Sequence, residues 1–76
     1  MPSAYILYSS EGCHLCEQAL AICLLYLSSE QITIVDIVDD ESLVERYGMS
    51  IPVLKRNVDN EELYWPFTTE QIIEFI

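Results

Sequence analysis

The chain has 76 residues, which suits one domain near the lower size limit for folding alone, and its hydrophobic share of 51% is enough for a packed core. Thirteen acidic residues face three basic ones, so the formal net charge is −10. Such a charge repels nucleic acid and anionic lipid. We therefore expect a single domain over residues 1–76 that binds neither nucleic acid nor a membrane.

The cysteine content and the apolar runs indicate the cellular compartment in which the protein is found. Three cysteines are an odd and sparse set, unlike the frameworks of disulfide-stapled secreted domains. Residues 1–3 lack the basic segment that opens a signal peptide. The longest apolar run, residues 19–27, is far short of the ~20 residues that span a bilayer. These features predict a cytoplasmic protein.

The N-terminal half predicts a strand, a helix and a second strand. Residues 4–8 form a continuous apolar run of strand length, which suits an interior strand. A loop follows, and its Gly12 can take the tight turn into the next element. We expect a helix over residues 14–28. The β-branched residues 31–37 then form the second strand.

The C-terminal half predicts a helix, two strands and a last helix. The acidic residues 39–41 begin a short helix that stops at Gly48. A third strand starts over residues 51–54, with a proline where a missing N–H is tolerated. A fourth strand follows over residues 62–65. The last helix, over residues 69–75, is preceded by capping-box spacing.

The predicted order is therefore βαβαββα. Strands separated by helices imply parallel pairing, and the final hairpin adds an antiparallel edge. The fold class is α/β, with a four-stranded mixed sheet flanked by three helices.

The most informative motif is Cys13-His14-Leu15-Cys16, at the junction between the first strand and the first helix. A helix N-terminus presents unpaired N–H groups and the positive end of the helix dipole, and both favour a thiolate. The second thiol lies one turn away, close enough to close a disulfide. The pair is therefore predicted to be a redox dithiol, with Cys13 and Cys16 as the catalytic residues.

This order of elements, with C-x-x-C after the first strand and Ile51-Pro52 opening the third, resembles the thioredoxin fold. In its compactness, the chain resembles the glutaredoxin-like branch of this fold. The segment Glu62-Leu63-Tyr64-Trp65-Pro66-Phe67 is similar to an uncharacterised bacterial branch of glutaredoxin-like proteins. The resemblance covers essentially the whole chain and implies a three-layer fold.

By position, the resemblance makes Cys13 the exposed nucleophile and Cys16 the buried resolving thiol. It makes Pro52 a cis-proline beside the dithiol, leaving the backbone of Ile51 free to pair with an extended substrate. The Cys13 thiolate would attack a substrate disulfide, and Cys16 would resolve the mixed disulfide. The family thus implies a thiol–disulfide oxidoreductase.

The expected substrate-binding residues are His14, Ile51, Pro52 and Trp65. Protonated His14 would stabilise the neighbouring thiolate; alternatively it is a solvated side chain of the first helical turn. Trp65 would form a wall of the substrate groove, or else pack in the core. Cys23 projects from the same helix face as Cys16, where core packing is the default over a third redox role.

Well-characterised glutaredoxins hold glutathione with basic residues near the dithiol and a Gly-Gly turn before the last helix. Here Glu11 precedes the motif, and residues 64–67 are bulky. Because glutathione is anionic, we expect it to bind weakly at most, and we expect no cofactor and no metal. The expected partner is a protein disulfide substrate or a redox partner.

Two other functions stay open. One is a non-catalytic thioredoxin-fold binding module whose dithiol serves as a redox switch. The other is a copper or zinc carrier, since C-x-x-C after a first strand also occurs in copper-carrying domains. The run at residues 19–27 is apolar all round, so it is either covered core or a contact surface. We therefore expect a monomer or a weak dimer.

Overall fold

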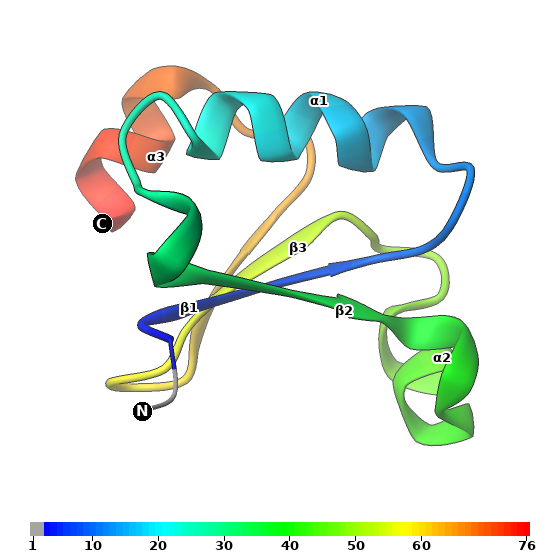
Figure 1. Cartoon of the computed structure of the whole chain (residues 1–76). Helices are drawn as coiled ribbons and strands as arrows, with labels where there is room; N and C mark the ends of the chain where they lie inside the picture. Colours follow the sequence, from blue (N-terminus) through cyan, green and yellow to red (C-terminus); the bar gives the residue numbers. More distant parts are fainter. Residues whose placement is uncertain (1–2) are drawn as a thin grey trace.

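The computed structural model describes residues 3–76 as a four-stranded sheet, in the order β2-β1-β3-β4, with helices on both faces (Figure 1). The prediction made from residues 1–3 lies partly outside the described residues. Two single-turn 3-10 helices flank the second strand, η1 (Ser29–Gln31) before it and η2 (Ile37–Asp39) after it. The main elements confirm the predicted order βαβαββα: β1 (Tyr5–Ser9), α1 (His14–Cys23), β2 (Ile32–Asp36), α2 (Glu41–Tyr47), β3 (Val53–Arg56), β4 (Glu61–Tyr64) and α3 (Thr69–Phe75).

Strand β1 lies inside the sheet, as its apolar run predicts. It pairs in parallel with β2 and antiparallel with β3. Because side chains alternate along a strand, Tyr5 and Leu7 join one core, whereas Tyr8 joins another with Ile6 packed against it. Both faces of β1 are therefore covered.

Helices α1 and α3 cover the first face (Figure 1). The buried residues on this side form a cluster that we call the α1–α3 core: Tyr5, Leu7, Ala19, Cys23, Leu27, Ile32, Leu54, Phe67 and Ile72. Full burial of each large aliphatic or aromatic side chain contributes about 1.5–3 kcal/mol. This is the larger of the two cores, and it fixes α1 on the sheet.

Helix α2 covers the other face. The buried residues there form the α2 core: Tyr8, Ile37, Tyr47 and Val53. The rings of Tyr8 and Tyr47 stack with centroids 4.4 Å apart. This stacking joins the end of β1 to the end of α2.

The direction of β3 corrects the sequence prediction. Helix α2 separates β2 from β3, yet β3 runs antiparallel to β1. Seven helical residues span only about 10 Å, too little to carry the chain back along the sheet. The chain therefore enters β3 at the end where β2 finished, and the sheet is mixed.

Helix α1 is shorter than predicted. It ends at Cys23, and the chain then turns so that Leu27 returns to the core. Ten helical residues rise about 15 Å, about the length of β1, so a longer helix would run past the sheet. The turn leaves Leu24, Leu25 and Tyr26 exposed at 44%, 69% and 41%. No helix within residues 3–76 has the length and apolar character needed to cross a membrane.

The start of β3 also differs from the prediction. The strand begins at Val53 rather than Ile51, because the N–H of Ile51 donates to the carbonyl of Tyr47 at the end of α2. Strand β4 likewise begins and ends one residue earlier than expected.

The start of α3 follows its sequence pattern. The N–H of Gln71 donates to Thr68 Oγ1 at 3.2 Å, and the N–H of Thr68 donates to Gln71 Oε1 at 2.8 Å. This is the predicted capping box. Phe67 and Ile72, on either side of the cap, are both in the α1–α3 core.

Two neighbouring isoleucines of α3 provide a matched test of this core. Ile72 is fully buried and Ile73 is 53% exposed. We predict that Ile72→Ala lowers the free energy of unfolding by about 2–5 kcal/mol. The control Ile73→Ala should stay within about 0.5 kcal/mol of the parent. Urea unfolding followed by circular dichroism measures both; equal losses would contradict the packing of α3.

Candidate active site

The dithiol lies where β1 ends and α1 begins. Gly12 has a φ of +79°, a left-handed conformation that glycine takes without strain. The N–H of Cys13 then donates to the carbonyl of Ser10 at 3.3 Å, which closes the turn. Cys13 is the N-cap of α1. The first cysteine is therefore held at the helix N-terminus, as predicted.

Cys13 and Cys16 form a disulfide, with their Cα atoms 5.2 Å apart, within the usual range. The backbone N–H of Cys16 also donates to Cys13 Sγ at 3.1 Å. Cys13 is half-buried, whereas Cys16 is only 5% exposed. The burial expected for the second cysteine is confirmed. In the reduced protein the same N–H and the positive end of the helix dipole would favour a thiolate at Cys13.

His14 lies on the surface of the first helical turn. Its side chain is 92% exposed, and its Nδ1 lies 3.5 Å from Glu17 Oε2. This placement matches the solvated alternative for His14. Contact between His14 and substrate remains a prediction.

Pro52 reaches the dithiol end of the sheet through the strand register. Tyr8 near the end of β1 pairs with Val53 at the start of β3, so Pro52 and the loop to Cys13 lie at the same end of the sheet. In Figure 1, β1 ends and β3 begins at this end of the sheet. Pro52 is buried, and the Ile51–Pro52 peptide bond is cis, as the family resemblance implied.

The backbone of Ile51 is not fully free, which corrects the expectation for this residue. Its N–H donates to the carbonyl of Tyr47 at 3.0 Å, and the N–H of Ser50 donates to the same carbonyl at 2.8 Å. The end of α2 has carbonyls without helical partners, and residues 50 and 51 supply donors to one of them. Only the carbonyl of Ile51 remains for pairing with an extended substrate.

The backbone of Trp65 contacts that of Pro52, because the N–H of Trp65 donates to the Pro52 carbonyl at 3.2 Å. Its half-buried ring packs against the α1–α3 core and meets Phe67 edge-on at 5.0 Å. The core-packing alternative therefore accounts for the ring. A role in substrate binding remains a prediction.

A polar network that the sequence did not indicate supports the Pro52 segment. The hydroxyl of buried Tyr47 donates to Glu62 Oε2, and Tyr64 donates to Glu62 Oε1 at 2.8 Å. Burial, followed by the bond to Glu62, raises the pKa of Tyr47. Burial opposes ionisation of Glu62, but the bonds from the two tyrosines and the charges of Arg46 and Lys55 together outweigh it, and its pKa lies below the ordinary value. The network ties the end of α2 to β4.

Cys23 is fully buried in the α1–α3 core. Desolvation raises the pKa of its thiol to about 11, so it stays protonated at neutral pH. The default expectation of core packing is confirmed.

A pocket of about 260 Å³ opens beside the dithiol, and we call it the β2-side pocket. The residues that line it come from β1, the turn after it, α1 and β2. They are Leu7, Ser9, Ser10, Glu11, Gly12, Cys13, Cys16, Glu17, Leu20 and Ile34. The sequence prediction missed Leu20 and Ile34, because their closeness to the dithiol depends on how α1 crosses the sheet.

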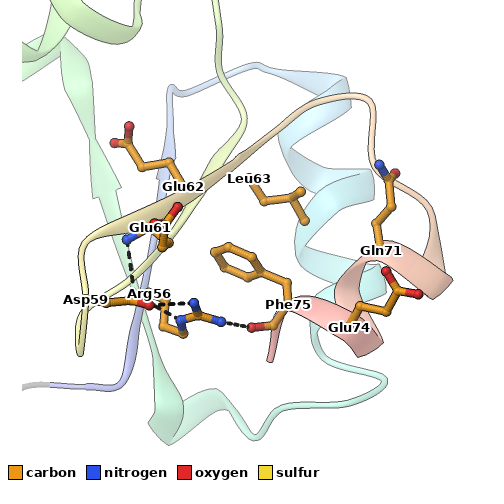
Figure 2. A pocket seen from close by; sticks show the side chains of 8 residues that line it. All are labelled: Arg56, Asp59, Glu61, Glu62, Leu63, Gln71, Glu74 and Phe75. Carbon is orange, nitrogen blue, oxygen red and sulfur yellow. Dashed lines mark hydrogen bonds and ion pairs between the residues drawn. The ribbon is translucent and has the colours of Figure 1, made fainter.

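A larger pocket of about 460 Å³ lies between the β3–β4 hairpin and α3 (Figure 2). Figure 2 shows the Arg56 guanidinium between Asp59 and the carbonyl of Phe75, both of which it hydrogen-bonds. Arg56 pairs with Tyr5, the first residue of β1, whereas the dithiol follows the last residue of that strand. This pocket is therefore at the opposite end of the sheet from the dithiol.

Among residues 3–76, no group of three or more His, Cys, Asp or Glu side chains is placed to hold a metal ion. A copper or zinc carrier would have to rely on the two sulfurs of the C-x-x-C motif there.

The comparisons with known proteins agree with this fold. The family described as "Glutaredoxin-like domain (DUF836)" matches residues 5–76. The chain belongs to this family. A search among curated proteins found no significant match for this glutaredoxin-like chain.

Two solved structures are similar to the glutaredoxin-like chain over nearly its whole length. Target protein XcR50 from X. campestris is 35% identical, with 95% of this chain and 93% of that chain covered and a TM-score of 0.82. Protein Ne2328 from Nitrosomonas europaea is 25% identical, with 100% and 93% covered and a TM-score of 0.80. The predicted thioredoxin-like fold is confirmed.

The three thiols of the reduced protein should titrate separately. We predict that Cys13 ionises first, because its sulfur accepts the N–H of Cys16, and that Cys23 ionises last, near pH 11. Ultraviolet absorbance of the thiolate against pH measures the steps. Cys13→Ser should remove the first step and Cys23→Ala the last. A first step that survives Cys13→Ser would contradict the assignment.

Proposed function

We propose that this glutaredoxin-like protein is a thiol–disulfide oxidoreductase that acts on protein disulfides through Cys13 and Cys16. The observation that carries the proposal is the disulfide between a helix-capping, half-buried cysteine and a buried one. The cap stabilises the attacking thiolate, and the short Cα–Cα separation of 5.2 Å allows the second thiol to complete the exchange.

The proposed reaction starts from the reduced dithiol. The Cys13 thiolate attacks one sulfur of the substrate disulfide, that bond breaks, and the departing sulfur takes a proton from water. Cys16, as its thiolate, then attacks Cys13 Sγ and releases the second substrate sulfur, which is also protonated. The substrate gains two electrons, and the protein is left with the Cys13–Cys16 disulfide.

Glutathione is expected to be a poor substrate. It is anionic, and the side chains beside the dithiol include the carboxylates of Glu11 and Glu17. Within residues 3–76, none of the basic residues Arg46, Lys55 and Arg56 lines this pocket. The proposed partners are a protein disulfide and a separate reductant, in a reducing compartment such as the cytoplasm.

A second candidate function is a redox-switched binding module. The observation in its favour is the exposed apolar turn after α1, formed by Leu24, Leu25 and Tyr26. In that case the dithiol would change the affinity for a partner, and no turnover would occur.

Turnover separates the two functions. We predict that the protein accelerates the reduction of insulin disulfides by dithiothreitol, followed by turbidity. Cys13→Ser should return the rate to that of dithiothreitol alone, because it removes the nucleophile. Cys16→Ala should accumulate a mixed disulfide with the substrate, detected by mass spectrometry, because it removes the resolving thiol.

Cys23→Ala is the matched control, since it removes a thiol that lies in the core and outside the pocket. It should turn over like the parent at a temperature where both are folded. An insulin rate that is unaffected by Cys13→Ser would refute the enzyme. A complex with a partner that forms only in one redox state, without turnover, would establish the binding module.

A further inference from the structure

The β2-side pocket is separate from the Pro52 segment. Its lining comes from β1, α1 and β2, and β2 flanks β1 on the side opposite β3. Pro52 directly precedes β3. The dithiol is thus approached from two sides of β1. On one side is the buried prolyl segment, and on the other is a pocket of about 260 Å³ whose lining includes Cys13 and Cys16.

Three aliphatic side chains form one part of the lining of this pocket. Leu7 is 1% exposed, Leu20 is half-buried, and Ile34 on the outer strand is 52% exposed. A volume of about 260 Å³ is smaller than the roughly 300–1,000 Å³ of pockets for drug-sized ligands. The pocket is therefore suited to one side chain rather than to a whole cofactor.

Two carboxylates also line the pocket, those of Glu11 and Glu17, and both residues are exposed. Among residues 3–76, no Lys or Arg forms an ion pair with either, and the only side chain that pairs with the Glu17 carboxylate is that of His14, at 3.5 Å. Every Lys and Arg of the chain lies at or beyond residue 46, outside the pocket lining. The negative potential beside the dithiol is therefore not neutralised by a fixed cation.

We propose that the β2-side pocket selects disulfides that carry a cationic group on an aliphatic stem next to the reacting sulfur, as a lysine beside a cystine would. The stem packs against Leu20 and Ile34, and the cation lies between Glu11 and Glu17. This inference rests on the proposed oxidoreductase function and names its substrate class. The reaction is the exchange written above, with no added reactant.

The test uses three symmetrical disulfides of similar size and different charge: cystamine, 2-hydroxyethyl disulfide and dithiodiglycolate. The rate constant of each with the reduced protein is measured by stopped-flow. Cationic disulfides react faster with any thiolate, so each rate is divided by that of the neutral compound, and the ratios are compared between variants. This division also removes any change in the reactivity of Cys13 itself.

In the Glu11→Gln/Glu17→Gln double variant, we expect the ratio for cystamine to fall about three-fold and the ratio for dithiodiglycolate to rise about three-fold. This is the effect expected from the loss of two screened carboxylate charges within a few ångströms of the charged group on the substrate. The control Glu45→Gln/Glu74→Gln makes the same change in net charge at exposed positions of α2 and α3. It should leave both ratios unchanged.

Each outcome has one meaning. If both double variants shift the ratios equally, the overall charge selects the substrate and the pocket assignment is overturned. If neither shifts them, the assignment is also overturned, while Cys13-dependent exchange with the neutral disulfide leaves the proposed function standing. If the parent shows no Cys13-dependent exchange with any of the three compounds, the proposed function itself fails.

Discussion

Strand β1 lies between a parallel and an antiparallel neighbour, and its side chains enter a core on each face. The C-terminal end of β1 is thus held in place by strand pairing on both edges and by side-chain packing on both faces. The turn from Ser10 to Cys13 begins at that fixed point, and the start of β3 is registered to it through the Tyr8–Val53 pair. The dithiol and Pro52 lie at the same end of the sheet because both are anchored to the same strand end.

The first turn of α1 uses one sulfur for two purposes. An N-cap side chain normally supplies an oxygen to an unpaired N–H of the first turn. Here the acceptor is Cys13 Sγ, and the donor is the N–H of Cys16, the cysteine that also closes the disulfide. The interaction that caps the helix therefore also brings the two cysteines together. In the reduced protein, a Cys13 thiolate would be a stronger acceptor for this N–H than the disulfide sulfur is, because charged acceptors form stronger hydrogen bonds.

Much of this fold follows from local sequence patterns. The apolar run of β1, the β-branched run of β2 and the capping box at Thr68 are decided within a few residues, and all three are where the sequence indicates them. The position of Cys13 is equally local, because it depends only on a strand ending and a helix beginning. These features need no knowledge of the rest of the molecule.

Other features depend on contacts between distant segments. The end of α1 is set by the depth of the sheet below it, and the direction of β3 by the short reach of α2. The bond between Tyr47 and Glu62 joins residues 15 apart, which no local pattern encodes. The N–H of Ile51 is taken by the end of α2, so its pairing state depends on where that helix stops. Residue spacing alone could not supply any of these.

The charges around the dithiol show how local sequence patterns and contacts between distant segments act together. In water, a carboxylate at roughly 7 Å destabilises a thiolate by about 0.6 kcal/mol, whereas a hydrogen bond to a charged group contributes about 1.5–3 kcal/mol. The N–H of Cys16 on Cys13 Sγ therefore outweighs the repulsion from Glu11 and Glu17.

The fixed cations do not alter this balance. Arg56 is paired with Asp59, and Arg46 lies 3.9 Å from Glu62, so both are engaged with the β3–β4 hairpin. Lys55 pairs across the same hairpin with Glu62 in the strand register. In the proposed mechanism, a short-range hydrogen bond would thus stabilise the thiolate, while the longer-range field of the two carboxylates would act on a charged group that approaches it. Under the proposed function, reactivity and substrate preference would be set by different groups at the same helix end.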